Sequence, residues 1–414
     1  MTVDRPTRLA WFSPLPPART GVAAYTVELL PYLERGHTID AYDANGAHEF
    51  AWRARRQPYD LVVYQLGNAP CHDFIWGHLA AYPGLVVLHD ARLHHARARQ
   101  LLAAKRDADY RREFWFDHPD VRADAAEYAV AAMGGPVQYL WPMRRLVLRA
   151  ARGVAVHNAI VADELRRDEP DARVDVIRMG VPPIDPDPRA GARVRAAFAL
   201  PDRAVVFAAF GKMTPEKRIG PIARALASLV DAGIDAHLLL IGEDGESFAA
   251  SDRVHATGYV RDADIAAHLV AADVCLCLRW PTALETSASW LRCLAAARAT
   301  IVTDLAHTAD VPAAVARRVD LLDEDRSLAD AMRDLATNEA ARAALARAGH
   351  AWWAAHHTME LMAEDYARVL DRTAAAPAPT PVDLPQHFRD DYSALARTIA
   401  DRYGVSVDVL GSGS

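Results

Sequence analysis

Two lysines in the second half of the chain have the types and spacing to hold an anion. The stretch FAAFGKMTPEKRIG places Lys212 directly after Gly211, and Lys217 stands just before an amphipathic stretch that begins at Ile219. A helix start offers free backbone N–H groups to an anion, and nearby ammonium groups add charge-assisted hydrogen bonds. The pattern is typical of a diphosphate site. The alternative is a charged surface loop.

A carboxylate stands at a similar junction further along the chain. The stretch PTALETSASWLRCLAAARATIVTD runs from a polar loop through a small apolar helix into a strand, with Glu285 where the loop becomes the helix. A fixed carboxylate accepts hydrogen bonds strongly from sugar hydroxyls. The small residues Thr286, Ser287 and Ala288 leave the helix start open, so that their amides would face phosphates. The alternative is an acidic cap that serves the helix dipole.

The first half of the chain carries candidate contacts after three apolar runs. Gly21, in SPLPPARTGVAAY, lets a ligand approach the backbone at a helix start, unless the turn serves only an N-cap by Thr20. His89, in VLHD, is expected to bond a hydroxyl or a phosphate with Asp90 orienting it; the alternative is a structural hydrogen bond. Weaker candidates for an acceptor site, the first two expected to be exposed in a loop, are Asn68, His72 and His94.

Parallel strands must position these loops, because strand-length apolar runs alternate with helical patterns along the chain. The runs lie at 8–12, 38–41, 61–65, 85–89, 154–157, 174–178, 205–210, 237–241, 253–256, 274–278 and 300–303. Amphipathic stretches between them include 22–33, 219–232 and 265–271. Ligands of such sheets bind at the carboxyl ends of the strands. The candidate residues stand in the loops that leave those ends.

The alternation is interrupted once, by GVPPIDPDPRAGA at 180–192. Its prolines cannot continue a helix or a central strand. We therefore predict an α/β protein with two doubly wound, Rossmann-like domains that face each other across a cleft, formed by residues 1–182 and 183–350. Residues 351–414 are predicted to hold a helix that returns to the amino-terminal domain, then a Pro/Ala linker and a tail with a helix over 386–403.

Composition restricts the class of protein. A chain of 414 residues, 51% of them apolar, is long enough for two full cores. Its net charge of -7 argues against a nucleic-acid binder. The four cysteines form no Cys-x-x-Cys pair, which argues against zinc and for a reduced, cytoplasmic protein. No apolar run reaches roughly 18 residues, so we expect no membrane-spanning helix.

The second half of the chain resembles the family 4 glycosyltransferases of the GT-B fold. Five segments, taken in order, carry the resemblance: GKMTPEK, IGEDGES, GYVRDADI, ADVCLCLRWP and ETSASWLRCLAAARATIVTD. The segments SPLPPARTGVAAY, VLHD and VHNAIVADEL resemble the amino-terminal half of the same family. The resemblance covers residues 7–370. It implies a retaining transfer of a sugar from a nucleotide-diphosphate sugar, which acts as co-substrate, with no further cofactor. We see no Asp-x-Asp loop placed for a metal, so lysines and helix amides are expected to stabilise the leaving diphosphate.

By position, the resemblance implies that Lys212 and Lys217 neutralise the diphosphate, Lys212 standing where the family usually has Arg. It implies that Glu285, the first Glu of the family signature, contacts sugar hydroxyls, and that His89 contacts the transferred sugar. The second signature Glu, a ribose contact, is replaced by Cys293, whose thiol is a weak hydrogen-bonding group. The donor-binding residues expected are Gly21, Gly211, Tyr259, Val260, Thr286, Ser287 and Ala288.

The acceptor would then bind to residues 1–182, and the nucleotide sugar would bind to residues 183–350. The acceptor is expected to be a glycan, a lipid-linked molecule or a small molecule, and no nucleic acid is expected. Basic residues followed by Phe-Trp-Phe over 92–116 suggest a peripheral contact with the inner face of the membrane; the alternative is a solvated helix with core aromatics. Two other functions stay open: a catalytically silent sugar-nucleotide-binding partner in a glycan-assembly complex, or another GT-B activity such as an epimerase or phosphorylase.

Overall fold

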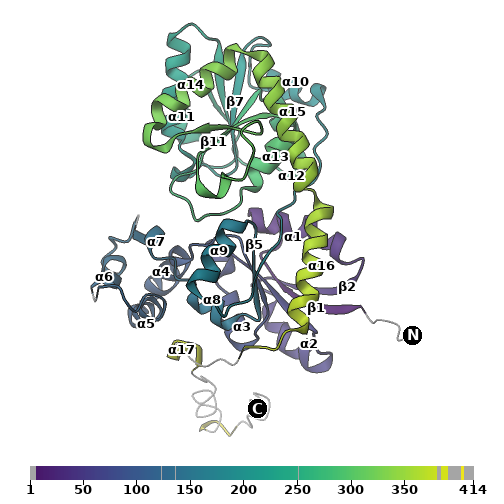
Figure 1. Ribbon diagram of the computed structural model, residues 1–414, viewed down its shortest axis with the longest axis vertical. Coiled ribbons are helices and arrows are strands. Elements are labelled where there is room, and N and C mark those ends of the chain that lie inside the picture. Colours follow the sequence, from purple (N-terminus) through teal and green to yellow (C-terminus); the bar gives the residue numbers. More distant parts are fainter. Residues whose placement is uncertain are drawn as a thin grey trace.

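The computed structural model describes residues 6–122, 124–135, 137–249, 251–379, 384–389 and 402–404. Within them, two α/β domains are stacked end to end (Figure 1). Each holds one six-stranded sheet, and every ladder between named strands in the described residues is parallel. The predicted fold class, two doubly wound Rossmann-like domains, is therefore confirmed.

The amino-terminal sheet has the strand order β2-β1-β3-β4-β5-β6. Its strands are β1 Thr7–Phe12, β2 His37–Tyr42, β3 Leu61–Leu66, β4 Leu85–Leu88, β5 Gly153–Val156 and β6 Val174–Val176. The order reverses between β1 and β3, so that the loops leaving these two strands diverge. A topological switch point of this kind is where open α/β sheets bind ligands. Residues of β3 and β4 are all buried, as expected for central parallel strands covered on both faces.

The carboxy-terminal sheet has the order β12-β11-β10-β7-β8-β9, with its switch point between β7 and β10. Its strands are β7 Val205–Phe210, β8 Ala236–Ile241, β9 Val254–Ala256, β10 Val274–Cys277, β11 Ala299–Thr303 and β12 Arg317–Val319. The sequence did not predict β12, a three-residue edge strand that begins on the exposed Arg317. Several predicted runs were also one or two residues too long, ending at His89, His157 and Arg178 after the chain has left the ladder.

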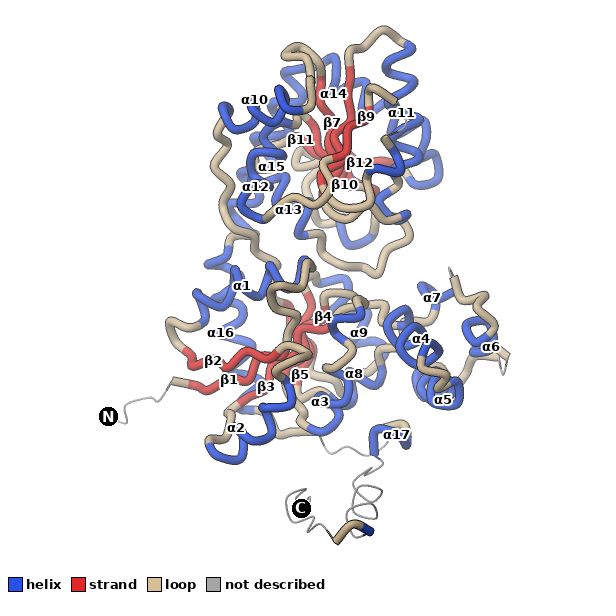
Figure 2. Tube along the Cα trace, turned by 180° about the vertical axis from the view of Figure 1, so that it is seen from behind, coloured by secondary structure: helices blue, strands red, loops and turns tan. Residues whose placement is uncertain are grey.

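Helices flank both sheets (Figures 1 and 2). Those of the first domain include α1 Gly21–Leu33, α2 Phe50–Arg56, α3 Ile75–Ala81, α8 Arg145–Ala150 and α9 Ala159–Asp168. Those of the second are α10 Pro188–Ala197, α11 Ile219–Asp231, α12 Asp262–Ala271, α13 Ala288–Ala295, α14 Glu324–Thr337 and α15 Glu339–His356. In α11, Ile222, Leu226 and Leu229 recur at helical spacing and bury an apolar stripe against the sheet. The predicted amphipathic stretches thus form α1, α11 and α12.

The chain crosses between the domains twice, at neighbouring places. Residues 177–187 lead from β6 to α10, and α16 Met359–Ala375 follows α15 back to the first domain, where it packs on α1 and β3 (Figure 1). The crossings are bonded to each other: Val181 N donates to His357 O at 3.0 Å, and His357 Nδ1 donates to Met179 O at 2.7 Å. A Cβ on Gly180 would overlap Thr358 O, so this approach requires glycine.

Four helices between β4 and β5 project from the side of the first domain (Figures 1 and 2). They are α4 His94–Ala103, α5 Asp107–Asp117, α6 Ala125–Val130 and α7 Val137–Leu140. We call this segment, residues 94–140, the helical insertion. It has a core of its own around the buried Tyr110 and Phe114. The sequence analysis did not predict it as a unit.

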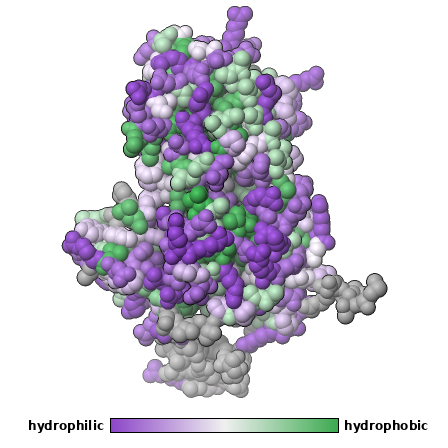
Figure 3. All heavy atoms as spheres, in the orientation of Figure 1, coloured by the Kyte–Doolittle hydropathy of each residue, from purple (hydrophilic) through white to green (hydrophobic). Residues whose placement is uncertain are grey.

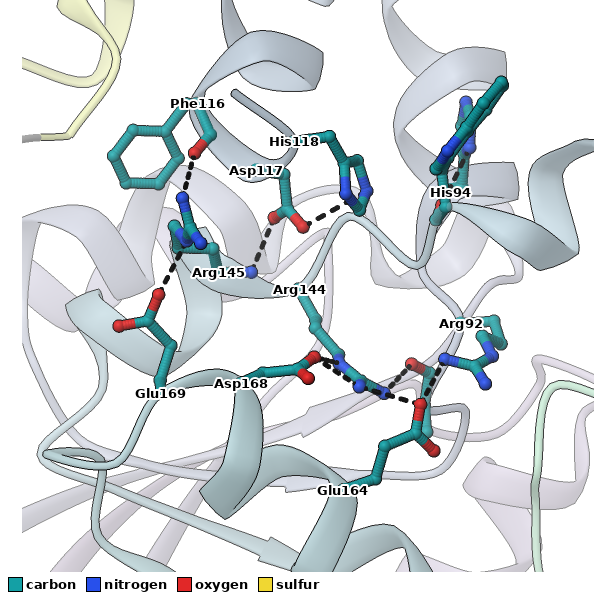
Figure 4. Close-up of polar contacts among 12 residues, drawn as sticks. Arg92, His94, Phe116, Asp117, His118, Arg144, Arg145, Glu164, Asp168 and Glu169 are labelled. Carbon is teal, nitrogen blue, oxygen red and sulfur yellow. Dashed lines mark hydrogen bonds and ion pairs between the residues drawn. The ribbon is translucent and has the colours of Figure 1, made fainter. Parts of the chain in front are cut away.

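Polar contacts join the helical insertion to the domain beneath it (Figure 4). The buried Arg144 forms ion pairs with Glu164 and Asp168, both on α9. Asp117, at the end of α5, accepts a hydrogen bond from Arg145 N at 2.6 Å. Burial raises the pKa of the Asp117 carboxyl to about 6. Of these contacts, the hydrogen bond from Arg145 N to Asp117 joins the helical insertion to the domain beneath it.

The basic residues of the predicted membrane contact are largely neutralised by carboxylates. Of the seven cations between residues 92 and 112, six form ion pairs: Arg92 with Glu164, Arg97 with Glu113, Arg99 with Asp73, Arg106 and Arg112 with Asp109, and Arg111 with Glu127. Phe114 is fully buried in the insertion core. No helix among the described residues has the length and apolar content to cross a membrane.

The end of the chain is described only in part. A short helix, α17 Gln386–Arg389, lies near the insertion, and His387 Nε2 hydrogen-bonds Glu113 Oε1 at 2.7 Å. Leu384 is buried in the core of the first domain. The remainder of the predicted helix over 386–403 falls mostly outside the described residues.

Candidate active site

Two adjoining cavities lie where the domains meet, at the level where hydrophobic spheres gather on the face drawn in Figure 3. The larger, of about 910 Å³, lies between the loops that leave β1 and β7. The smaller, of about 190 Å³, lies between the loops that leave β5, β10 and β11. Both are lined by Phe210, Lys217, Arg279 and Ser289, so these residues mark their common border. We call the two spaces the large cavity and the small cavity.

Most of the predicted donor-binding residues line these cavities. Gly21, Gly211, Tyr259, Val260 and Ala288 line the large cavity, and Thr286 and Ser287 line the small one. The hydroxyl of Thr20 does cap α1, since it accepts from Ala23 N at 3.1 Å. However, a Cβ at Gly21 would have no described atom within 4 Å. The space beside this glycine therefore belongs to the cavity.

Lys217 lies at the border between the cavities. Its Nζ donates to the Phe210 backbone oxygen at 2.5 Å, which directs the side chain across the end of β7. Burial, with a smaller contribution from the cation Arg279, lowers the pKa of the Lys217 ammonium to about 8. Taking a charge out of water weakens its hydration and strengthens its attraction to an anion that reaches it.

The second predicted lysine occupies a different position. The Lys212 side chain is 63% exposed, and its Nζ lies 3.3 Å from Asp244 Oδ2 at the rim of the large cavity. Both lysines line the large cavity, Lys217 at its border with the small cavity and Lys212 at its exposed rim. Lys212 is a surface ion-pair partner, a class of contact that contributes little to stability, and its contact with a donor stays a prediction.

Arg279 supplies a cation that the sequence analysis missed. It follows β10, at the switch point of the second sheet, and its backbone N donates to Thr303 Oγ1 at 3.0 Å. Its Nε lies 2.9 Å from Glu285 Oε1, and its guanidinium has no other partner among the described residues. Two N–H-bearing nitrogens thus stay free to bind an anion in the forked geometry that arginine favours. Arg279 follows a strand at the switch point, and this position is the signal in the sequence by which the residue could have been found.

Glu285 is held by its own loop rather than by the helix. Its Oε2 accepts from Thr282 Oγ1 at 2.9 Å, in addition to the ion pair with Arg279. The alternative interpretation, in which Glu285 caps the helix, is wrong, because α13 begins at Ala288 and the Ser287 hydroxyl accepts from Trp290 N. Glu285 lines the small cavity, where its remaining lone pairs can accept from hydroxyls.

The loop that carries Glu285 is bonded to the first domain. Ala91 N donates to Ala283 O at 2.9 Å, and Asn158 Nδ2 donates to Leu284 O at 3.2 Å. Leu284 has a φ of 61°, in the left-handed region that a branched side chain rarely adopts. Strain of this kind persists where surrounding contacts impose it. The first domain therefore helps to fix the conformation of the Glu285 loop.

His89 and its neighbour differ in detail from the prediction. His89 Nε2 hydrogen-bonds Gln65 Oε1 at 2.8 Å, so Gln65 orients the imidazole and Asp90 does not. Asp90 Oδ2 instead accepts from Asn68 N at 2.7 Å. Burial, and next the Glu285 carboxylate, raise the pKa of Asp90 to about 6. Two carboxylates, one from each domain, thus interact across the junction.

The three predicted acceptor contacts are engaged in structural bonds. His72 is buried, not exposed, and its Nδ1 bonds Gln65 O at 2.8 Å. Asn68 is half-buried rather than exposed, and its amide donates to Arg92 O at 2.7 Å. His94 is also buried, between Trp141 O and the Tyr110 hydroxyl. The expected exposure of Asn68 and His72 is therefore wrong, and an acceptor contact by any of the three residues stays a prediction.

Cys293 faces the interior of the second domain. It is fully buried, its Sγ lies 3.9 Å from Cys277 Sγ, and it is not among the described residues that line the two cavities. Hydrogen bonds with the thiols of Cys275 and Cys277, and next burial, raise the pKa of the Cys293 thiol well above its usual value. Its neighbour Arg292 lines the large cavity and pairs with Glu28 of α1 at 2.5 Å. Across the described residues, no group of three or more His, Cys, Asp or Glu side chains could hold a metal.

Residues 204–338 match the model of a protein family described as glycosyl transferases group 1. This segment contains Gly211, Lys212, Lys217, Arg279 and Glu285. No curated protein matches the chain.

Several solved structures share the arrangement of both domains. Sucrose-phosphate synthase from Thermosynechococcus elongatus is 15% identical, with a TM-score of 0.64 over 88% of this chain and 98% of its own. WaaG, a glycosyltransferase involved in lipopolysaccharide biosynthesis, is 15% identical, with a TM-score of 0.58 over 88% and 99%. HepE from Anabaena, solved with UDP-glucose, is 13% identical, with a TM-score of 0.57 over 88% and 99%. The second domain thus contains a segment that matches the group 1 glycosyl transferases, both domains share the GT-B fold of these structures, and the two findings together indicate a glycosyltransferase.

Proposed function

We propose that the protein is a retaining glycosyltransferase that moves a sugar from a nucleotide-diphosphate sugar to a glycan, a lipid-linked molecule or a small molecule, without a metal. The observation that carries the proposal is the position of Lys217 and Arg279 beside Glu285, at the switch point of the second sheet. Two cations and a carboxylate at one border match the two ends of such a donor, an anionic diphosphate and a ring that bears hydroxyls.

The chemistry follows from where charge develops. As the bond between the anomeric carbon and the phosphate oxygen breaks, negative charge grows on the leaving diphosphate. The Lys217 ammonium and the Arg279 guanidinium stabilise that charge. Hydroxyls of the transferred sugar donate to Glu285. The acceptor hydroxyl attacks the same face of the anomeric carbon, and its proton passes to the leaving phosphate, so a second carboxylate as nucleophile is not needed.

In this proposal, each domain binds one of the two substrates. The donor binds residues 183–350 with its phosphates toward Gly21, and the acceptor approaches from residues 1–182, where His89 contacts the transferred sugar. Cys293 cannot serve the ribose in this arrangement, because its thiol lies in the core. HepE was solved with UDP-glucose, which makes UDP-glucose the first donor to test.

A direct test is a thermal-shift screen against UDP, GDP, dTDP and their sugars. A ligand that binds only the folded state raises the melting temperature, and raises it more the tighter it binds. We expect one nucleotide series to stabilise the protein and its sugar to be consumed when an acceptor is added. Absence of stabilisation by every nucleotide and nucleotide sugar would contradict the proposal.

Metal removal is expected to leave sugar transfer essentially unchanged. Fixed cations on the protein supply the neutralisation that a bound divalent ion supplies in other transferases. The measurement is initial rate with saturating EDTA against rate with added Mg²⁺ or Mn²⁺. A strict requirement for either ion would overturn this part of the proposal.

Nucleotide affinity is expected to weaken as pH rises through about 8, the pKa of Lys217. The diphosphate binds the charged ammonium, and deprotonation removes that charge, so the apparent Kd should rise by up to about tenfold per pH unit above this value. The matched variant is Lys217→Arg, whose guanidinium stays charged throughout and should give a flat profile. The measurement is UDP affinity from pH 6.5 to 9.5, and an equal slope in Lys217→Arg would assign the titration to another group.

Contact between residues 92–116 and the membrane stays a prediction, and the ion pairs that the arginines of this segment form weigh against it. We expect little co-sedimentation with anionic vesicles even at low salt, because paired cations have little net charge to offer. Salt-sensitive binding that disappears when the exposed Lys105 is changed to Glu would instead support a membrane contact.

The alternative of a catalytically silent partner rests on Cys293. A buried thiol replaces the carboxylate that the family resemblance expects at the ribose, so donor affinity could fall below what catalysis needs. The two functions differ in the fate of the donor. If a nucleotide sugar binds but stays intact with water and with a broad set of acceptors, the silent partner is favoured. Release of the nucleotide with formation of a glycoside supports the transferase.

A further inference from the structure

The helical insertion reaches the second domain through Tyr139 of α7. The Tyr139 hydroxyl donates to Glu216 Oε1 at 3.2 Å. Burial, and next the Glu216 carboxylate, raise the pKa of the Tyr139 phenol to about 12, so the hydroxyl keeps its proton and stays a donor near pH 7. The Tyr139 ring also packs edge-on against the His95 ring of α4, with 4.7 Å between the ring centroids. The insertion therefore holds this hydroxyl in a defined position.

Glu216 connects the contact to both cations of the candidate active site. It directly precedes Lys217 in a short helical turn, Pro215–Lys217. Its backbone oxygen accepts from Trp280 N at 2.8 Å, and Trp280 directly follows Arg279. Glu216 thus joins the loop after β7 to the loop after β10. A contact that fixes the Glu216 side chain therefore helps to fix the loops of Lys217 and Arg279.

The helical insertion is itself firmly attached to the first domain. Leu93 N donates to Pro142 O at 2.8 Å, which ties the start of the insertion to its end. The Arg97 guanidinium of α4 lies over the Trp76 ring of α3, 4.4 Å from the ring centroid. Because the insertion also has a core of its own, it can act as a stiff arm of the first domain.

The Tyr139 contact lies far from the places where the chain crosses between the domains. The crossings run along one side of the molecule and the insertion projects from the other, with α7 on the side that faces the second domain (Figures 1 and 2). Domains that move as rigid bodies rotate about the segments that connect them. Such a rotation would separate Tyr139 from Glu216 by more than it separates Glu28 from Arg292, since α1, which carries Glu28, packs on α16 beside the crossings.

We propose that the helical insertion is a latch that keeps the two domains closed over the donor, with Tyr139 as a positioning residue for the loops of Lys217 and Arg279. This inference rests on the proposed function. The large cavity takes walls from both domains, including Gly21 and Lys217, so it is complete only when the domains are closed. A hydrogen bond to a carboxylate is stronger than one between neutral groups, so the half-buried contact favours the closed state.

The test is hydrogen–deuterium exchange of backbone amides in the protein without ligand. Tyr139→Phe keeps the ring against His95 but removes the donor, and should speed exchange in peptides that cover 214–217 and 279–284 about tenfold. The melting temperature should barely change. Tyr128→Phe is the matched control, because Tyr128 is an exposed tyrosine on α6 of the same insertion. It should exchange like wild type in these peptides.

A variant in the second domain guards against a local disturbance of the insertion. Glu216→Ala removes the acceptor and should speed exchange in the same peptides. Adding Tyr139→Phe to it should cause no further change, because the two groups act as a pair. Three results would overturn the latch: exchange in Tyr139→Phe matches wild type, Tyr139→Phe keeps its full effect in the Glu216→Ala background, or Tyr128→Phe accelerates exchange equally.

UDP-glucose supplies a second measurement. Tyr139→Phe lowers the closed fraction of the free protein, so the KM for UDP-glucose should rise up to about tenfold. The kcat should change less than about twofold, because saturating donor closes the domains again. Faster exchange with an unchanged KM would overturn the proposal, since the contact would then not serve the donor.

Failure of this inference is distinct from failure of the proposed function. If no nucleotide binds, the proposed function fails, and exchange in the free protein still decides whether Tyr139 restrains the Lys217 loop. If UDP-glucose is bound and turned over but Tyr139→Phe exchanges like wild type, the transferase stands and only the latch is wrong.

Discussion

Glu285→Gln is expected to lower turnover roughly ten- to a hundredfold for each hydrogen bond from the sugar that it weakens, while affinity for the free nucleotide barely changes. The neutral amide accepts more weakly than a carboxylate, and its NH₂ faces hydroxyls that need an acceptor. Charge-assisted hydrogen bonds are about twice as strong as neutral ones, so the cost is on the order of 1–3 kcal/mol per hydrogen bond. The free nucleotide carries no sugar at this position. The asymmetry between turnover and nucleotide affinity identifies a sugar contact.

The structure identifies two controls for Glu285→Gln. Ser287 caps α13, so Glu285→Gln should leave the melting temperature nearly unchanged. Thr282→Val removes the hydroxyl that supports Glu285 but keeps the carboxylate, and should reduce turnover much less. Melting temperature, UDP affinity and turnover are measured on both variants. A loss of stability with unchanged turnover would mean that Glu285 serves only to hold Arg279 and its loop.

Lys217→Ala is expected to reduce turnover about ten- to a hundredfold or more. The ammonium makes a charge-assisted contact worth roughly 1.5–3 kcal/mol, most of it realised as charge grows on the leaving diphosphate. Thermal stability should change little, because the variant loses one hydrogen bond to Phe210 O and also removes a partly desolvated charge. The measurement is turnover at saturating donor alongside the melting temperature.

Lys212→Ala is the matched comparison for Lys217→Ala. Both variants remove one ammonium from the same loop, but Lys212 is exposed and paired with Asp244 at the rim. Its removal should raise the KM for donor only a few fold, within the range of an exposed charge contact. If the two variants act alike, the diphosphate binds at the rim and the border position of Lys217 has been misinterpreted. Equal turnover in Lys217→Ala and wild type would remove Lys217 from the mechanism.

The fold was predictable because parallel strands that are covered on both faces read as continuous apolar runs. Runs such as 61–65 and 237–241 have the length of strands and are too short for typical helices. Edge strand β12 was missed because it has three residues and begins on an exposed arginine. The helical insertion was missed for a related reason: its helices are short, and α5 mixes charged and aromatic residues without a clear stripe.

The candidate site was predictable where position along the chain decides it. Gly21, Lys217 and Glu285 follow strands whose carboxyl ends must meet at the cleft. Residues whose partners come from distant segments were not predictable. Gln65 and not Asp90 orients His89, and the insertion buries His94, contacts that depend on packing. Arg279 acquires its role from Glu285, which lies on the same loop but reaches it only once the loop is folded.

The paired crossings between the domains have a consequence for how the molecule unfolds. Residues 179–181 share hydrogen bonds with His357, and Tyr366 of α16 bonds the Tyr25 hydroxyl inside the first domain. Neither domain can unfold beside the crossings without breaking hydrogen bonds that it shares with the other domain. We therefore expect the two domains to unfold together, with a single heat-absorption peak in calorimetry rather than two. A protease cut in one crossing would leave the halves joined through the other.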